Sequence, residues 1–231
     1  MQFKTIAEEN GELSFIGYFP NFLTETEVFD LEAYLHSTKD WRGGTLGFGH
    51  QIPRLQKWFH EDSMPFAKSW HKQYPRWQSF DYTQFWYSLQ NKVISRYEDI
   101  CIPHMPKDDS INHHPKFNSI LVNYYRNGND SIKAHRDSQP EFGDNPTILC
   151  ISLGQPRKLV FKRVLYQKEK PISLKTDKST KELNCEYLME PGSLIVMAGS
   201  TQKYFCHEIP KDQTLSSTNS SRFSLTFREH R

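Results

Sequence analysis

Cysteine is scarce in this sequence and never falls in the C-x-x-C spacing of a redox or metal-binding motif. The four cysteines are Cys101, Cys150, Cys185 and Cys206. Cys150 lies inside an apolar run, a setting typical of a buried free thiol. This usage favours a protein that is kept in a reducing compartment.

Long apolar runs and an excess of charge of one sign are absent too. No stretch approaches the length of roughly 20 apolar residues that a membrane-spanning helix needs. Residues 1–9 contain neither the basic segment nor the apolar segment of a signal peptide. The net charge is only +2, so any basic surface must be local. We expect an intracellular protein, nuclear or cytoplasmic, that is not secreted, does not enter membranes and is monomeric.

The chain length predicts one domain with one sizeable core, because 231 residues are enough to bury it. We expect a helical half over about 13–116 and a β-rich half over about 117–231. The first half starts with a predicted strand over 13–19. A helix follows Thr24, a suitable N-cap, with Glu25 and Glu27 placed favourably in its first turn. A second helix is predicted near 84–97.

From Phe117 onward the apolar pattern has a period of two, which predicts strands. Alternation places Asn123 and Tyr125 on a common face, and apolar runs over 147–153 and 193–198 predict two further strands. Over 222–228, Arg222, Ser224, Thr226 and Arg228 share one face, opposite Phe223, Leu225 and Phe227. Two arginines in front of an apolar back predict a polar cavity for an anion such as a dicarboxylate. Two arginines exposed on a sheet edge are the alternative.

Tryptophans and local positive charge gather in one segment. All five tryptophans lie between Trp41 and Trp86, and six Lys or Arg between 41 and 80 face only Glu61 and Asp62. Interleaved aromatic and cationic side chains suit stacking on bases beside phosphates, and core packing is the alternative. The glycine-rich segment 43–49 predicts a flexible hairpin or flap that exposes apolar tips such as Phe48.

A second basic segment lies in the β-rich half. Residues 157–181 contain nine Lys or Arg against Glu169 and Asp177, with Glu182 just beyond. The pattern predicts a basic hairpin with a loop at its tip. A solvated, charged sheet edge is the alternative interpretation.

A metal site is predicted where an imidazole and a carboxylate share one face of an extended segment. His135 and Asp137 are two residues apart, and residues at that spacing point the same way in a strand. His207 is the best candidate for a third ligand. Two histidines and one carboxylate with open positions form the facial triad of non-haem Fe(II) oxygenases.

The order of these features resembles the AlkB family of Fe(II)/2-oxoglutarate dioxygenases, most closely its eukaryotic repair demethylases of alkylated DNA. The match covers about 117–231 without large gaps and extends more loosely back to Phe15. The motifs that carry it are Asn123-Tyr124-Tyr125-Arg126-Asn127-Gly128, His135-x-Asp137, Ser152-Leu153-Gly154, Pro191-Gly192-Ser193-Leu194, His207, Arg222-x5-Arg228 and, in the first half, Pro53-Arg54-x-Gln56.

The resemblance implies a mainly β (α+β) fold, in which a double-stranded β-helix, or jelly roll, carries an N-terminal nucleotide-recognition lid. It implies His135, Asp137 and His207 as ligands of Fe(II), with 2-oxoglutarate and O2 as cosubstrates. Arg222 is expected to bind the distal carboxylate of 2-oxoglutarate with help from Tyr125, while Asn123 and Arg228 lie near the end that chelates iron. Thr226 is counted among the cosubstrate-binding residues.

The implied activity is oxidative removal of N-alkyl groups from nucleobases, with methylated DNA as the partner. A duplex base must be flipped out and held to reach such a site. The substrate-binding candidates are Arg54, Gln56, Phe59, Tyr74, Arg76, Trp77 and Gln139. Gln139 stands where many repair relatives carry an acidic residue, and 209–221 offers only Lys211 where duplex-specific relatives have a basic loop. Both differences bear on substrate preference.

Three alternatives remain open at this level. Demethylation of RNA or protein on the same iron scaffold is the first, and a nucleic-acid-binding protein with an inactive triad is the second. The third is a zinc module, for which the spacing fits no common structural-zinc pattern well; its candidate ligands are Cys101, His104, His113, His114 and Cys206.

Overall fold

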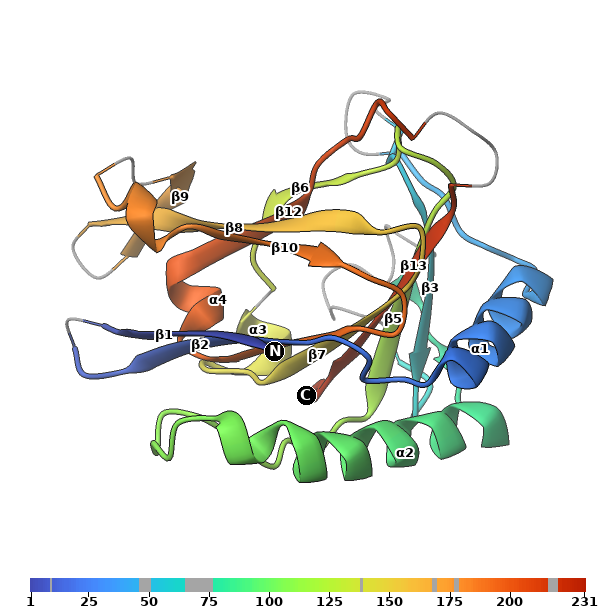
Figure 1. Cartoon of the computed structure of the whole chain (residues 1–231), viewed down its shortest axis with the longest axis horizontal. Helices are drawn as coiled ribbons and strands as arrows, with labels where there is room; N and C mark the ends of the chain where they lie inside the picture. The colour runs from blue at the N-terminus through green and yellow to red at the C-terminus, as the bar shows by residue number, and fades with distance from the viewer. Residues whose placement is uncertain are drawn as a thin grey trace.

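Two β-sheets form the body of the molecule (Figure 1). The computed structural model describes residues 1–8, 10–45, 51–64, 77–137, 139–167, 170–176, 179–215 and 220–231. The eight-stranded sheet contains, in spatial order, β1 (Gln2–Ala7), β2 (Leu13–Phe19), β11 (Leu194–Gly199), β7 (Ile148–Gly154), β13 (Arg222–Arg228), β5 (Ser119–Tyr125), β3 (Leu55–His60) and β4 (Phe80–Asp81). The smaller sheet contains β10 (Cys185–Met189), β8 (Arg157–Gln167), β12 (Phe205–Ile209) and β6 (Ile132–His135), and β9 (Lys170–Thr176) pairs with β8.

The helices flank this body. Besides the two long helices, α1 (Glu25–Ser37) and α2 (Gln84–Ile100), the described chain forms four short ones: α3 (Gln139–Phe142), α4 (Thr201–Tyr204), and the 3-10 turns η3 (Ile102–His104) and η4 (Lys181–Leu183). The predicted mainly β fold with flanking helices is confirmed. Strands from both halves of the sequence share the larger sheet, since β2 pairs with β11 and β3 with β5.

One apolar core lies between the two sheets. Ile16 and Ile195 of the larger sheet belong to the same buried cluster as Phe161, Tyr187 and Phe205 of the smaller one. Two sheets whose inner faces share a core have the layered architecture of a sandwich. The polar site described below lies within this layer, beside the apolar cluster.

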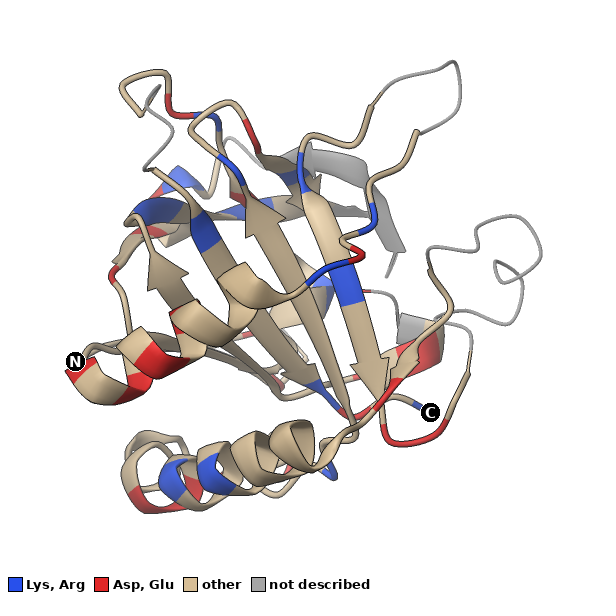
Figure 2. Cartoon of the chain, turned by 90° about the vertical axis from the view of Figure 1, so that its right-hand side faces the viewer, with Lys and Arg blue, Asp and Glu red and all other residues tan. Residues whose placement is uncertain are grey.

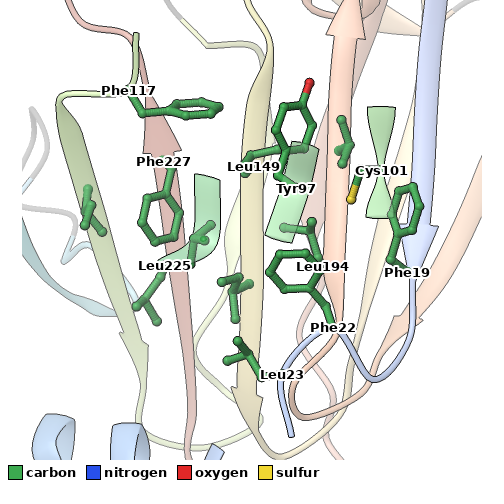
Figure 3. Packing of buried hydrophobic residues seen from close by; sticks show 14 of the residues in the cluster. Phe19, Phe22, Leu23, Tyr97, Cys101, Phe117, Leu149, Leu194, Leu225 and Phe227 are labelled. Atoms are coloured by element: carbon green, nitrogen blue, oxygen red, sulfur yellow. The ribbon is translucent and has the colours of Figure 1, made fainter. Parts of the chain in front are cut away.

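A second core lies on the outer face of the larger sheet, under α1 and α2 (Figure 3). Phe223, Leu225 and Phe227 of β13 point into it and are at most 1% exposed. Their neighbours Arg222 and Arg228 point to the inner face. The alternation predicted for 222–228 is therefore confirmed, and it separates an apolar back from a polar front as the pleat requires.

Both predicted long helices are present, and the first begins at its predicted N-cap. The Oγ1 atom of Thr24 accepts a hydrogen bond from the backbone N–H of Glu27, whose carboxylate accepts one from the N–H of Thr24, a complete capping box. Glu27 also forms an ion pair with Arg96 of α2, at 2.7 Å. The second predicted helix is confirmed and continues to Ile100, beyond its expected end near 97.

The nucleic-acid-stacking interpretation is wrong for several of the tryptophans. Trp86 and Trp58 are 1% and 2% exposed, and Trp41 packs against Tyr124 and Phe223. Trp77 is partly buried and packs against the small apolar cluster that contains Trp58. Trp70 and most of the predicted flap, Phe48 included, lie outside the described residues.

The predicted hairpin is formed by β8 and β9. The described basic side chains on β8 are buried or paired with acidic groups, so they do not form an unpaired basic surface. The Arg157 guanidinium is buried and donates to the carbonyls of Asp130 and Pro210. The other three described cations on β8 pair with acidic groups: Lys158 with Glu186, Lys162 with Glu208, and Arg163 with Glu8. Figure 2 shows Lys and Arg interspersed with Asp and Glu over the face in view. None of the helices described is long and apolar enough to span a bilayer.

Candidate metal centre

Strand pairing brings the two histidines of the predicted triad together. His135 ends β6, and His207 lies directly opposite it on β12. Residues opposite each other on antiparallel strands have neighbouring side chains, and the two imidazole centroids are 4.3 Å apart. Asp137 follows just beyond the end of β6. The three side chains each place one ligand atom within 4.8 Å of the others.

Each of these groups is held in the protonation state that binds a cation. Burial lowers the pKa of His135 and of His207, so both imidazoles are neutral at pH 7. Burial alone raises the pKa of Asp137, but Arg228 and the two histidines outweigh it and lower that pKa below its ordinary value. The Nδ1–H of His135 donates to the carbonyl of Lys133 at 3.0 Å, which leaves Nε2 for a metal.

The zinc alternative is wrong for the described chain. Among the residues that the structure describes, the triad is the one group of three His, Cys, Asp or Glu side chains whose ligand atoms converge. Cys101 belongs to the core under the helices, whereas Cys206 belongs to the smaller sheet. All four cysteines are free.

A cavity extends from the triad across the inner face of β13. The predicted cosubstrate-binding residues line it together with His135 and His207, and they are Asn123, Tyr125, Arg222, Thr226 and Arg228. The register explains this convergence, because Arg222 pairs with Tyr125 and Ser224 with Asn123 across β13 and β5. Side chains opposite each other on neighbouring strands lie on the same face.

Arg222 has hydrogen-bonding capacity left over. It is 1% exposed, its Nε–H donates to the Ser152 hydroxyl at 3.0 Å, and its guanidinium carbon lies 5.1 Å from the Tyr125 ring centroid. Its Nη1 atom is buried without a hydrogen-bond partner among the described residues. A buried N–H with no acceptor is costly. The cavity therefore offers a guanidinium donor to an anion, and a carboxylate fits that donor.

Arg228 forms an ion pair with one member of the triad, Asp137. Its Nε–H donates to Oδ2 of Asp137 at 2.9 Å, and its guanidinium carbon lies 5.1 Å from the centroid of the Phe142 ring. This pair is almost fully buried. Arg228 thus fixes one carboxylate oxygen and leaves the other, Oδ1, on the side of His135.

Some of the predicted substrate-binding residues contact residues that line this cavity. The Arg54 Nε–H and the Gln56 side-chain amide both donate to Oδ1 of Asn123, at 2.8 and 3.0 Å. Trp77 packs in the small cluster that contains Leu121, a cavity-lining residue. Tyr74, Arg76 and the side chain of Gln139 lie outside the described residues.

Phe59 is a correction. It lies on the outer face of the sheet, 4.1 Å from Trp86 between ring centroids, and belongs to the core under the helices. Gln56 and Phe59 are three positions apart on one strand, so they necessarily point to opposite faces. The assignment of Phe59 to the substrate site is therefore wrong.

Two residues of β7 on the cavity side were missed at the sequence level. Ser152 holds Arg222, and Cys150 lines the cavity, half-buried, with its Sγ atom 3.6 Å from Oγ1 of Thr226. Burial raises the pKa of Cys150, so it is a thiol. Alternation along 147–153 places both residues on one face of the strand. The sequence around them does not show that this strand pairs with β13.

Comparisons with known proteins agree with this site. The model of the 2OG-Fe(II) oxygenase superfamily matches residues 15–228. Human alpha-ketoglutarate-dependent dioxygenase alkB homolog 3 is 27% identical over 213 residues, which are 91% of this chain and 64% of the human protein. DNA oxidative demethylase ALKBH2 of Arabidopsis thaliana is 31% identical over 121 residues, 49% of this chain and 38% of that protein.

A solved structure gives the same result for the fold. OsALKBH1 matches with a TM-score of 0.61 at 14% identity, covering 92% of this chain and 97% of the other. The two facing sheets and this likeness confirm the predicted jelly-roll core. The chain belongs to the 2OG-Fe(II) oxygenase superfamily. The two relatives described above are similar to it and are AlkB homologues by name.

The chain spans less than two thirds of each of the two relatives described above. The superfamily implies Fe(II), 2-oxoglutarate and O2. The donor set fits the metal, because two neutral imidazoles and one carboxylate converge. The unpartnered Nη1 of Arg222 fits a carboxylate of 2-oxoglutarate.

Proposed function

We propose that this chain is an Fe(II)- and 2-oxoglutarate-dependent oxidative demethylase that removes N-alkyl groups from nucleobases, with alkylated DNA as its substrate. The observation that carries the proposal is that the His135–Asp137–His207 triad and the buried Arg222 line or adjoin a single cavity. Its relatives include proteins named as a dioxygenase and as a DNA oxidative demethylase.

The proposed roles are those that the resemblance to the AlkB family implies. His135, Asp137 and His207 hold the metal, and Arg222 binds the distal carboxylate of 2-oxoglutarate beside Tyr125. Bound Fe(II), with 2-oxoglutarate and O2, supplies the oxidation of an N-alkyl carbon, after which the alkyl group is lost as an aldehyde. No side chain has to act as a nucleophile. The protein contributes orientation, exclusion of water and fixed charges.

The substrate side of the proposal rests on residues that contact the lining of the cavity. Arg54 and Gln56 donate to Asn123, a lining residue, and Trp77 packs in the cluster of Leu121, another lining residue. We propose that a flipped base is held beside these residues, with Tyr74, Arg76 and Gln139 as further candidates. Residues 1–231 are proposed to act as one domain and as a monomer, in the nucleus or cytoplasm.

Mass spectrometry of methylated oligonucleotides incubated with Fe(II), 2-oxoglutarate and ascorbate tests the proposal. Each methyl group should be lost with release of one aldehyde and one succinate. Asp137→Ala should abolish turnover while the fold is retained, and Asp81→Ala, which removes an exposed carboxylate of β4, should not change it. Full iron-dependent activity in Asp137→Ala would contradict the site.

The second candidate is demethylation of RNA or protein on the same scaffold. Succinate release on methylated RNA or on a methylated peptide, with none on methylated DNA, would favour it. That outcome would leave the roles of the triad and of Arg222 unchanged.

A further inference from the structure

The backbone of Asp137 is not held by the hydrogen bonds of a β-strand. It lies two residues beyond the last residue of β6, outside any strand. Its backbone N–H nevertheless donates to Oε1 of Gln202 at 3.0 Å. Both residues are buried, at 8% and 1% exposure. A buried backbone N–H without an acceptor is strongly disfavoured. This hydrogen bond therefore fixes the position of the Asp137 backbone.

Gln202 is attached to the larger sheet. It belongs to α4, whose first residue, Thr201, donates through its hydroxyl to the carbonyls of Ala198 and Phe15. The chain enters α4 through Gly199, which has a φ of +61° and whose Cβ, if present, would lie 2.1 Å from the carbonyl oxygen of Leu13. The Gln202 amide also donates to the Met197 sulfur at 3.4 Å. Gln202 therefore has a fixed position.

A second hydrogen bond joins the same two segments. The Arg136 guanidinium donates to the carbonyl of Lys203 at 3.3 Å. The short helix α4 thus holds two successive residues of the segment that carries the metal ligand. The carboxylate of Asp137 is meanwhile held by Arg228 from β13. Its backbone and its side chain are anchored independently.

We propose that Gln202 is a positioning residue of the metal centre. By holding the backbone of Asp137, it sets the direction from which Oδ1 approaches the metal and so raises the affinity of the triad. The proposal rests on the metal site of the proposed function. Partners that orient metal ligands typically contribute about 10- to 100-fold in metal affinity.

Co(II) titration of metal-free protein, followed by visible absorption, tests this. Gln202→Met keeps the side-chain length and removes the acceptor, so it should weaken Co(II) binding about 10- to 100-fold and alter the spectrum. Gln90→Met is the matched control, because Gln90 is equally buried on α2 but bonds to Tyr82 and Glu61. It should lower stability and leave Co(II) affinity unchanged. Equal Co(II) affinity in Gln202→Met and wild type would overturn the proposal.

Amide hydrogen exchange on the metal-free wild type provides a test that does not depend on a stable variant. The Asp137 amide should be protected although it lies outside any strand. Exchange at the rate of an unprotected loop would overturn the proposal. Wild-type protein that binds no Co(II) at all would instead overturn the metal site itself, and with it the proposed function.

Discussion

Arg222 and Arg228 lie on one face of β13 and differ in what they bind. Arg228 is paired with Asp137 and is part of the metal centre's own framework. Arg222 bonds to Ser152 through Nε, and its Nη1 stays without a partner among the described residues. The two arginines therefore have separate expected effects when replaced, one on the metal and the other on the cosubstrate.

Arg222→Ala should raise the Kd for 2-oxoglutarate at least about tenfold, because a charge-assisted hydrogen bond contributes roughly 1.5–3 kcal/mol. Arg222→Lys should recover only part of this affinity, since an ammonium cannot reproduce a planar fork. Isothermal titration with 2-oxoglutarate on the metal-loaded protein measures both. The Co(II) affinity of each variant serves as the control and should stay near wild type. Unchanged 2-oxoglutarate binding in both variants would contradict the assignment.

At the scale of elements, Glu27 connects the two helices that cover the outer face of the larger sheet. Its carboxylate completes the capping box of α1 and accepts from Arg96, and Lys92 pairs with it from α2. Its side chain is only 18% exposed. The hydrogen bond from Arg96, followed by those from Lys92 and Thr24, outweighs burial and lowers the pKa of Glu27 well below 4.5.

Glu27→Gln should lower the free energy of unfolding by about 1–3 kcal/mol at pH 7, since it weakens hydrogen bonds to a charged group. A carboxyl with a lowered folded-state pKa stabilises the protein above its unfolded-state pKa, and this stabilisation disappears as the pH falls through the folded-state value. The difference between wild type and variant should therefore shrink below pH 4.5. Urea denaturation across pH measures this. Glu25→Gln, in the same first turn, is the control, and an equal destabilisation there would contradict the role of Glu27.

On the scale of the whole molecule, charge is balanced and locally paired. The net charge is +2, and the described cations at the base of the β8–β9 hairpin are buried or bound to carboxylates. Any attraction for a nucleic acid must come from other cations of the chain.

Replacing Lys168, Lys170, Lys175 and Lys178 by Ser should weaken oligonucleotide binding for all sequences and reduce its salt dependence. Each phosphate that the variant no longer neutralises should make the slope of log K against log salt shallower by about 0.7 for a single strand. Fluorescence anisotropy at several salt concentrations measures the slope. Lys158→Ser is the control, because that ammonium already pairs with Glu186. An unchanged slope in the fourfold variant would exclude these four lysines from the interface.

Properties that depend on neighbours along the chain can be predicted from the sequence alone. The capping box at Thr24 and the two faces of 222–228 follow from local backbone geometry, and both are confirmed. The triad residues were named from spacing and resemblance, and the structure brings their ligand atoms together. A pleat fixes which residues share a face whatever the rest of the fold does.

Which face of a strand points inward, and which strands pair, depends on contacts between distant segments. The pairing of β6 with β12 places His207 beside His135, and the packing of β3 under α2 turns Phe59 into the core instead of the cavity. The same packing buries Trp86, whereas Trp58 is buried on the opposite face of β3, in a cluster with Leu121 and Phe142. The placement of α4 brings Gln202 to Asp137. These outcomes depend on contacts between segments far apart in sequence, which no local period can specify, because alternation leaves the choice of face and partner to burial.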